Sequence, residues 1–193
     1  MPQIILASSS TYRKELLQRL LLDFKVVSPN VDEKKIKSEN AYESAERLAE
    51  EKGKKISNQF KDAVVIGCDQ TAEYNNIQIE KPLNFESSFS QLKELSGKKV
   101  NFFSAIFVTH FNKNISYKKV ISFDVKYKTL SSLEIKNYLR QEEPFNCVGS
   151  IKSEGLGISL LEEINSNDPT AIIGLPLISL VKILKEFGIK VNE

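Results

Sequence analysis

Residues 3–21 read QIILASSSTYRKELLQRLL and decide the fold, because a strand passes there directly into a helix. The apolar run predicts a strand over 3–7, and leucines at helical spacing predict a helix over 11–21 with Ser10 as its N-cap. Yet the first turn carries Arg13 and a lysine, where a cation costs roughly 0.3–1 kcal/mol. Backbone N–H groups, hydroxyls and an arginine at a helix start can together form an anion site. The alternative is that the serines only cap the helix and Arg13 extends into water.

Composition and charge narrow the class of protein. The 193 residues are 41% apolar and 27% charged, which is ordinary for a globular protein and predicts one domain over 1–193. A net charge of +2 provides no basic field, so no nucleic-acid partner is expected. Cys68 and Cys147 lack metal-ligand spacing and predict free thiols in a reducing, cytoplasmic compartment. The apolar stretch 172–184 is broken by a proline and a lysine, so it predicts a core segment and no membrane partner.

Strands and helices alternate along the rest of the chain, which predicts an α/β fold with a mixed sheet and flanking helices. Asn75-Asn76 indicates a hairpin turn, Asn84 a helix N-cap, and Ser131 with Glu134 a capping box. This pattern is compatible with two lobes around a cleft. The predicted strands cover 24–28, 62–74, 77–80, 100–110, 115–128 and a pair around 148–162, and the further predicted helices cover 39–56, 85–95, a segment from 132 to the residues before Pro144, and 177–187.

Two acidic positions are candidates for chemistry. Asp69 follows a buried apolar run and is expected at a strand end, where α/β sheets usually bind ligands. A carboxylate there can hold a divalent cation or accept a proton from water, although an aspartate that only forms a turn is an equal alternative. Glu33 belongs to an acid pair at the start of a charged loop, and such pairs are usually just solvated.

Three lysines fit their surroundings poorly. Lys52 falls on the apolar face of the helix predicted over 39–56, Lys81 precedes a proline, and Lys152 is expected inside a mostly uncharged strand. A lysine is rarely buried unless it is paired, although each of these is more often an apolar stem that reaches into water. Taken together, the cations, the helix start and the carboxylates suit a polyphosphate with a divalent metal and hydrolysis through metal-bound water.

Other chemistries find little support. The single histidine, His110, falls in a hydrophobic strand and is expected to be structural, so serine-protease chemistry is not indicated. The sequence contains no zinc-ligand cluster, no dinucleotide fingerprint and no Walker loop. The GLG at 155–157 is interpreted as a bend in a strand.

Several segments together carry a resemblance to a known family. They are ILASSSTYRKELL, VIGCDQ, EKPL followed by LSG, VGSIKSEGLGI and IIGLPL, in this order over nearly the whole chain. This set resembles the Maf family of nucleotide pyrophosphatases, and most closely the subgroup that hydrolyses 7-methyl-GTP. The related dTTP/UTP pyrophosphatases usually have threonine where this chain has Gln70, and glutamine where it has Glu154.

The resemblance implies a fold related to the inosine triphosphate pyrophosphatases (Maf/Ham1), with the active cleft between two lobes. It implies cleavage of a nucleoside triphosphate between the α and β phosphates, with Mg²⁺, Mn²⁺ or Co²⁺ as cofactor. It gives Asp69 the role of proton acceptor and, with Glu33, that of metal ligand. The phosphate-binding residues implied are Ser8, Arg13, Lys52 and Lys81, and those implied for substrate choice are Tyr12, Gln70 and Glu154.

The chemistry of the base explains the residues implied for substrate choice. Methylation at N7 makes guanine a cation, on which Tyr12 could stack for ~0.5–2 kcal/mol. Glu154 could accept hydrogen bonds from N1–H and the exocyclic amine, whereas uracil offers one N–H between two acceptors. The alternative is that Tyr12 only packs and that Glu154 pairs with Lys152.

The chain also departs from the family pattern. Thr11 replaces a proline that suits the first position of a helix, which softens the turn slightly. Gly53 replaces an alanine, which loosens the helix next to Lys52 by up to ~1 kcal/mol. Cys68 replaces serine, and Glu80 replaces glycine, where it is expected to weaken phosphate binding or to add a metal ligand. None of these changes removes a central group, so an active enzyme is expected.

The leading hypothesis is therefore a house-cleaning enzyme that converts 7-methyl-GTP to 7-methyl-GMP and pyrophosphate. One alternative keeps the reaction and changes the substrate to other nucleotides such as dTTP or UTP. Another is a regulator of septum formation, to which the family's name refers, with hydrolysis secondary. The oligomeric state stays open, with a homodimer as one alternative.

Overall fold

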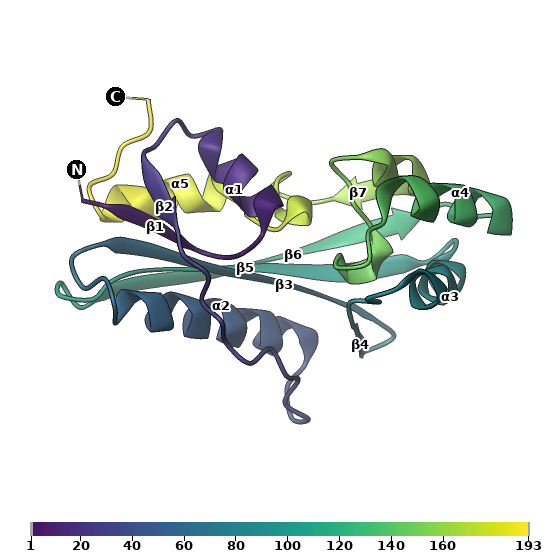
Figure 1. The fold of residues 1–193 in the computed structure, drawn as a ribbon, viewed down its shortest axis with the longest axis horizontal. Helices are drawn as coiled ribbons and strands as arrows, with labels where there is room; N and C mark the ends of the chain where they lie inside the picture. The colour runs from purple at the N-terminus through teal and green to yellow at the C-terminus, as the bar shows by residue number, and fades with distance from the viewer. Residues whose placement is uncertain (1, 193) are drawn as a thin grey trace.

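The computed structural model describes residues 2–192, which fold around one mixed sheet of seven strands (Figure 1). The strand order is β2-β1-β3-β5-β6-β7, with β4 paired to β3. Strand β1 runs parallel to β2 and β3, and the other pairings are antiparallel. The strands are β1 (Ile4–Ala7), β2 (Phe24–Val26), β3 (Val64–Tyr74), β4 (Ile77–Ile79), β5 (Lys99–His110), β6 (Ile115–Tyr127) and β7 (Leu161–Asn165), and the α-helices are α1 (Thr11–Gln18), α2 (Ala41–Ser57), α3 (Phe85–Leu95), α4 (Ser132–Glu142) and α5 (Leu177–Glu186).

Local signals in the sequence fix most element boundaries. Asn84 caps α3, and Ser131 with Glu134 forms the capping box of α4, as predicted. The hairpin between β3 and β4 turns at Asn75 and Asn76, both with positive φ (51° and 62°), which asparagine tolerates. Helix α1 ends at Gln18, three residues before the predicted end.

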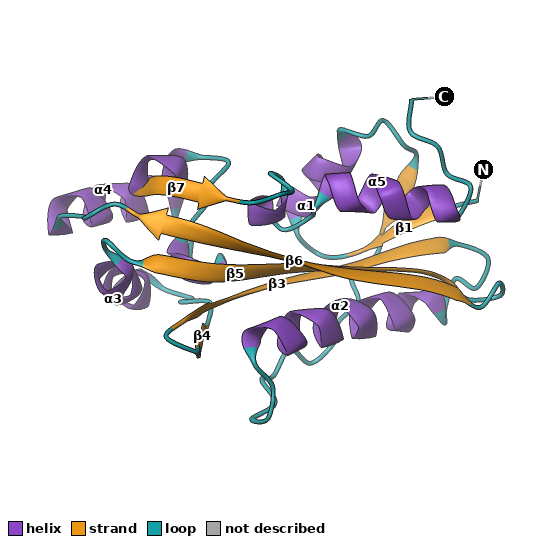
Figure 2. Cartoon of the chain, turned by 180° about the vertical axis from the view of Figure 1, so that it is seen from behind, coloured by secondary structure: helices purple, strands orange, loops and turns teal. Residues whose placement is uncertain are grey.

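Helices cover both faces of the sheet at the end that contains the termini (Figure 2). Helices α1 and α5 pack on one face over an apolar cluster that includes Leu16, Ile66 and Leu180. Helix α2 lies on the other face, close to β3. At Gly67 a Cβ atom would lie 2.2 Å from the carbonyl oxygen of Ala49, so only glycine permits this approach. The close contact brings the side chains of α2 onto β3.

A second apolar cluster occupies the other end of the long strands. There α3 and α4 pack against β5 and β6, with Tyr127 and Tyr138 fully buried and Phe102 stacked on Phe123. The long strands β3, β5 and β6 thus join two lobes, each with its own apolar cluster. This confirms the predicted mixed α/β fold with flanking helices.

The segment 148–162 does not form the predicted strand pair. It consists of two 3₁₀ turns, Val148–Ser150 and Leu156–Leu160, joined by a loop, and only its end, where β7 begins at Leu161, is a strand. Gly149 and Ser150 both have positive φ, which a strand cannot accommodate. Lys152 therefore lies in a loop rather than in a strand, and the GLG segment belongs to a turn rather than to a strand bend.

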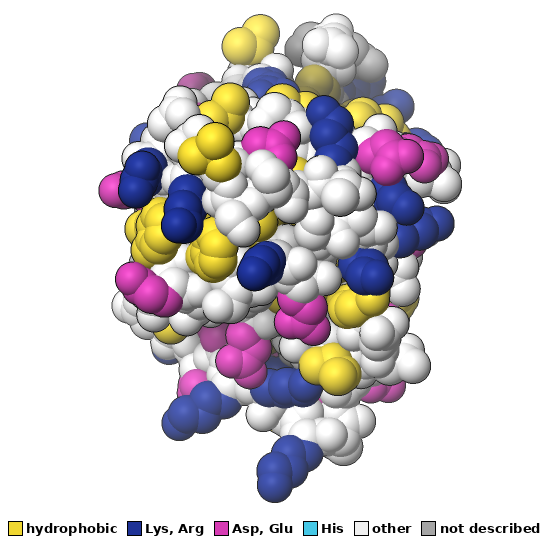
Figure 3. All heavy atoms as spheres, turned by 90° about the vertical axis from the view of Figure 1, so that its right-hand side faces the viewer, with side chains coloured by type: hydrophobic (Ala, Val, Ile, Leu, Met, Phe, Trp, Pro, Cys, Tyr) yellow, Lys and Arg dark blue, Asp and Glu magenta, His cyan; other side chains and the backbone are white. Residues whose placement is uncertain are grey.

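The surface at the α3 and α4 end carries basic and acidic side chains intermingled (Figure 3). This distribution fits a net charge of only +2. None of the helices within residues 2–192 is long and apolar enough to cross a membrane.

Candidate active site

A cavity of about 590 Å³ opens between the two lobes. Residues of α1, the β2–α2 loop, α2 and β3 line one part of it, and the segment 146–154 lines another. The structure thus brings together every residue that the sequence predicts for the site, although the roles of these residues stay proposals. The predicted residues in the lining are Ser8, Tyr12, Arg13, Glu33, Lys52, Asp69, Gln70, Lys81 and Glu154.

Asp69 lies in the middle of β3 and not at a strand end, which corrects the prediction. Strand β3 continues to Tyr74 because β5 pairs with it throughout, with Ala105 opposite Asp69. The neighbouring strand β1 stops at Ala7, opposite Gly67. Asp69 therefore lies just beyond the carboxyl end of β1, the parallel neighbour of β3. It thus lies at a strand end of the kind where α/β sheets bind ligands, but the strand that ends there is β1.

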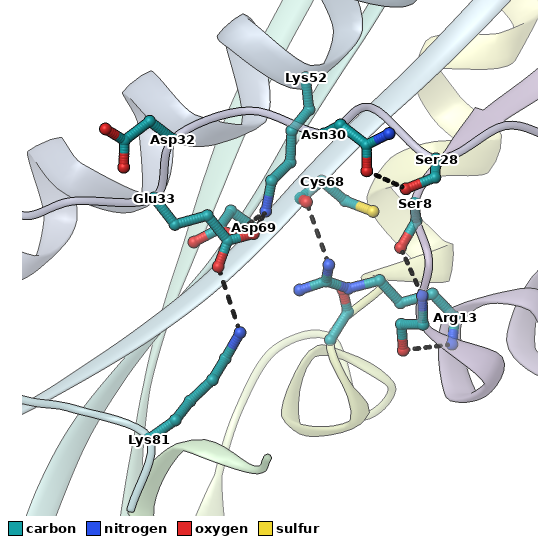
Figure 4. A network of polar contacts seen from close by, with 12 residues as sticks. Ser8, Arg13, Ser28, Asn30, Asp32, Glu33, Lys52, Cys68, Asp69 and Lys81 are labelled. Atoms are coloured by element: carbon teal, nitrogen blue, oxygen red, sulfur yellow. Dashed lines mark hydrogen bonds and ion pairs between the residues drawn. The ribbon is translucent and has the colours of Figure 1, made fainter. Parts of the chain in front are cut away.

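Lys52 lies between two carboxylates (Figure 4). Its Nζ is 2.6 Å from Asp69 Oδ1 and 2.6 Å from Glu33 Oε1. The side chain of Lys52 is only 5% exposed and is paired, so the alternative in which its apolar stem carries the ammonium group into water does not hold for this lysine. Lys81 reaches the same group, with its Nζ 3.3 Å from Glu33 Oε2, while Asp32 points away.

This cluster shifts the protonation equilibria of its members. Burial lowers the pKa of Lys52, but the charge of Asp69 and hydrogen bonds to Asp69 and Glu33 outweigh burial and raise the pKa overall. Partial burial raises the pKa of Glu33, but the hydrogen bond and charge of Lys52, together with Lys81, lower it to about 2. Lys52 and Glu33 are therefore both charged at neutral pH.

Arg13 is held by backbone carbonyls beneath the start of α1. Its Nε donates to the carbonyl oxygen of Gly174 at 2.9 Å, and its Nη1 donates to that of Cys68 at 3.1 Å (Figure 4). The alternative in which Arg13 extends into water is thereby excluded. Ser10 caps the helix by accepting from the Arg13 N–H, and the buried Ser8 hydroxyl accepts from the Ser10 N–H. The first residues of this helix line the cavity.

The other part of the cavity contains the residues expected to contact the base. Gln70 Nε2 donates to the carbonyl oxygens of Ala171 (3.0 Å) and Ile172 (2.9 Å), which fixes its amide orientation. Partial burial raises the pKa of Glu154. Lys152 does not pair with Glu154, as one alternative supposed, because its Nζ contacts Glu142 Oε2 at 2.8 Å.

Part of the cavity lining is not predicted from the sequence. Ser28 and Asn30 follow β2, which is parallel to β1, so the strand-end argument could have found them. Asn146, Cys147 and Val148 carry no motif that predicts a binding role, and only the tertiary fold places them here. Of the departures considered, Glu80 is exposed and does not line the cavity, so its side chain is not placed as an extra metal ligand.

The carboxylates of Glu33 and Asp69 lie near each other, because both contact the Nζ atom of Lys52. In the described part of the chain, no three His, Cys, Asp or Glu side chains are grouped to hold a metal by themselves. Two carboxylates nevertheless fit a divalent cation such as Mg²⁺, which commonly completes its ligands with phosphate oxygens and water.

These features define an α/β protein whose interlobe cavity concentrates cations and carboxylates in a manner suited to a phosphate-rich ligand. The chain belongs to the Maf-like protein family, whose model matches residues 3–187. A Methylobacillus flagellatus protein named 7-methyl-GTP pyrophosphatase is 44% identical over 191 residues, which are 99% of this chain and 100% of the relative.

The chain is also similar to further proteins. Proteins with the same name from a Polaromonas species and from Colwellia psychrerythraea are 43% and 42% identical and cover 96% and 99% of this chain, and 85% and 96% of their own lengths. The solved structure of the Staphylococcus aureus Ham1 protein matches with a TM-score of 0.41 and 15% identity, over 65% of this chain and 71% of that one.

Proposed function

We propose that this protein is a nucleoside triphosphate pyrophosphatase that hydrolyses 7-methyl-GTP to 7-methyl-GMP and pyrophosphate. The observation that carries the proposal is the convergence of Arg13, Lys52 and Lys81 with Asp69 and Glu33 in one cavity. The three cations can offset part of the charge of a triphosphate, and the carboxylates provide a base and ligands for a metal. The substrate is inferred from the names of relatives that are 42–44% identical over nearly the whole chain.

The proposed reaction places the triphosphate along the cationic part of the cavity. Asp69 accepts a proton from the water that attacks the α-phosphorus, and the bond from that phosphorus to the bridging oxygen breaks to release pyrophosphate. Lys52 orients the Asp69 carboxylate, while Arg13 and Lys81 offset charge on the phosphates. A divalent cation held by Glu33 and Asp69 would supply further charge neutralisation and a more acidic water.

Base recognition is proposed for the part of the cavity lined by Tyr12, Gln70 and Glu154. Because the amide N–H groups of Gln70 are engaged by backbone carbonyls, its free oxygen can only accept. Glu154 is a second acceptor and carries negative charge. Two acceptors suit N1–H and the amine of guanine, and the charge favours the cationic 7-methyl form over guanine itself.

A substrate panel tests this function. Release of pyrophosphate is measured with 7-methyl-GTP, GTP, UTP and dTTP, each with Mg²⁺, Mn²⁺ or Co²⁺ and with a chelator. We expect the highest kcat/KM with 7-methyl-GTP and loss of activity in the chelator. A preference for UTP or dTTP would instead support the alternative substrate. Absence of pyrophosphate release from every nucleotide would contradict the proposal and favour a binding protein.

A further inference from the structure

Helix α4 holds the loop that carries Glu154, through two side chains one helical turn apart. The Tyr138 hydroxyl accepts from the backbone N–H of Lys152 at 3.0 Å. Glu142 Oε1 accepts from the backbone N–H of Leu156 at 2.6 Å. The helix thus grips the loop on both sides of Glu154, which itself faces the cavity.

Glu142 also binds a side chain of the same loop, that of Lys152. Its second oxygen, Oε2, lies 2.8 Å from Lys152 Nζ, and the carboxylate is only 15% exposed. Gly155 packs against it so closely that a Cβ there would lie 2.5 Å from Glu142 Oε1. The Leu156 N–H and the Lys152 side chain lower the pKa of Glu142, so its charge persists at neutral pH.

Lys152 connects this arrangement to the other lobe. Its Nζ lies 5.7 Å from the centroid of the Tyr12 ring, which belongs to α1. An ammonium group at this position would repel a cationic base placed on Tyr12, unless its charge is offset. Glu142 offsets that charge through the ion pair and directs the Lys152 side chain.

We propose that Glu142 is a positioning residue for base recognition, which sets the place of Glu154 and neutralises Lys152 beside Tyr12. This inference rests on the proposed function, because it assigns the base to the Tyr12 and Glu154 part of the cavity. Glu142 itself does not line the cavity, so it acts through its neighbours. Its effect should therefore be confined to the base and leave binding of the phosphate tail unchanged.

The test measures binding and turnover separately. Calorimetry gives the affinities for 7-methyl-GMP, GMP and inorganic tripolyphosphate, and pyrophosphate release gives kcat and KM for 7-methyl-GTP. The variants are Glu142→Gln, which keeps an oxygen for the Leu156 N–H but loses the charge, and Glu142→Ala, which loses both. Gly155→Ala keeps the charge but displaces the carboxylate. Glu143→Gln is the matched control, since it removes the same charge from the exposed neighbouring residue.

For Glu142→Gln we expect KM for 7-methyl-GTP to rise about tenfold with kcat within about twofold, as for loss of one charge-assisted hydrogen bond. The affinity for 7-methyl-GMP should fall more than that for GMP, and the affinity for tripolyphosphate should not change. Glu142→Ala should have a larger effect, Gly155→Ala should weaken 7-methyl-GMP binding, and Glu143→Gln should match the unmodified protein. Adding Lys152→Met to Glu142→Gln should restore most of the preference for the methylated base.

Two results would overturn the inference. One is unchanged 7-methyl-GMP affinity in Glu142→Ala, and the other is a parallel loss of tripolyphosphate affinity, which indicates a merely structural role. Turnover and binding separate this inference from the proposed function. If the unmodified protein binds 7-methyl-GMP but releases no pyrophosphate, the proposed function fails, and the binding of 7-methyl-GMP still tests the role of Glu142. An unmodified protein that binds neither 7-methyl-GMP nor GMP and releases no pyrophosphate would contradict both.

Discussion

The Nζ atom of Lys52 lies 2.6 Å from Oδ1 of Asp69, and the two side chains are only 5% and 8% exposed. Such a buried ion pair is costly to desolvate and is weak evidence for a stabilising role. The glycine contact between α2 and β3 makes this approach possible, and a second carboxylate, Glu33, shares the same lysine. The pair is therefore better explained by the chemistry of the cavity than by stability.

The first prediction concerns Lys52. Lys52→Met keeps the length of the side chain but leaves Asp69 buried without its cation, so the free energy of unfolding should fall by roughly 3–5 kcal/mol. Urea unfolding followed by circular dichroism measures this change. The double variant with Asp69→Asn should recover most of the loss, because neither member of the buried pair is then charged. A loss below about 1 kcal/mol in Lys52→Met would contradict the prediction.

The second prediction concerns the glycine contact. In Gly67→Ala the new Cβ would lie 2.2 Å from the Ala49 carbonyl oxygen and 2.6 Å from the Gly53 nitrogen, both backbone atoms that cannot move alone. We expect the free energy of unfolding to fall by about 1–3 kcal/mol or more, because the clash pushes α2 away from β3. This shift would also move Lys52 away from Asp69, so kcat should be lower.

Gly53→Ala is the matched comparison for this contact. Its Cβ would meet the Phe107 ring at 2.5 Å, and a side chain can shift more easily than backbone. The gain in helix propensity, up to ~1 kcal/mol, opposes that strain, so the net change in stability should be smaller than for Gly67→Ala. Equal effects of the two variants on stability and kcat would show that the backbone contact is not decisive.

The third prediction concerns acid stability. The pKa of Glu33 is lowered from 4.5 to about 2, so its contribution to stability is present above pH 4.5 and is lost as the pH falls toward 2. Glu33→Gln should therefore show a shallower fall in the free energy of unfolding over this pH range. Asp32→Asn is the control, because Asp32 forms an exposed ion pair with Lys34. The same pH dependence in Glu33→Gln and the unmodified protein would refute the assignment.

The fourth prediction concerns Glu154. Glu154→Gln keeps an acceptor but removes the charge, so the ratio of kcat/KM for 7-methyl-GTP to that for GTP should fall about tenfold. Because partial burial raises the pKa of Glu154, the unmodified protein should lose this preference on acidification at a higher pH than an ordinary glutamate would allow. Glu162→Gln, on the exposed part of β7, should leave the ratio unchanged. A constant ratio in Glu154→Gln would argue against charge recognition of the base.

Local sequence signals predicted most of the fold, because they encode their structure within a few residues. The Asn84 cap, the Ser131 and Glu134 capping box and the Asn75-Asn76 turn are of this kind. The segment 148–162 could not be predicted in this way. Its course depends on Tyr138 and Glu142, which hold it from helix α4 through hydrogen bonds to backbone N–H groups. Such contacts leave no pattern inside the segment itself.

The sequence predicted the residues of the candidate site, as it predicted most of the fold, but not all of their contacts. A lysine on an apolar helix face, such as Lys52, indicates a buried partner, and the structure supplies Asp69 and Glu33. The sequence could not show that Asp69 lies in mid-strand, because that depends on the length of its pairing with β5. Nor could it show that Arg13 binds the carbonyl oxygens of residues 68 and 174, since such contacts carry no side-chain signature.

The most direct measurement compares the unmodified protein with Asp69→Asn in a 7-methyl-GTP assay that identifies the products. The unmodified protein should give 7-methyl-GMP and pyrophosphate, and not 7-methyl-GDP and phosphate. The Asp69→Asn variant, with a circular dichroism spectrum that shows it is folded, should lose activity by about 10²–10⁴-fold, the usual contribution of a general base. Undiminished pyrophosphate release by folded Asp69→Asn would contradict the role of this cavity in the reaction.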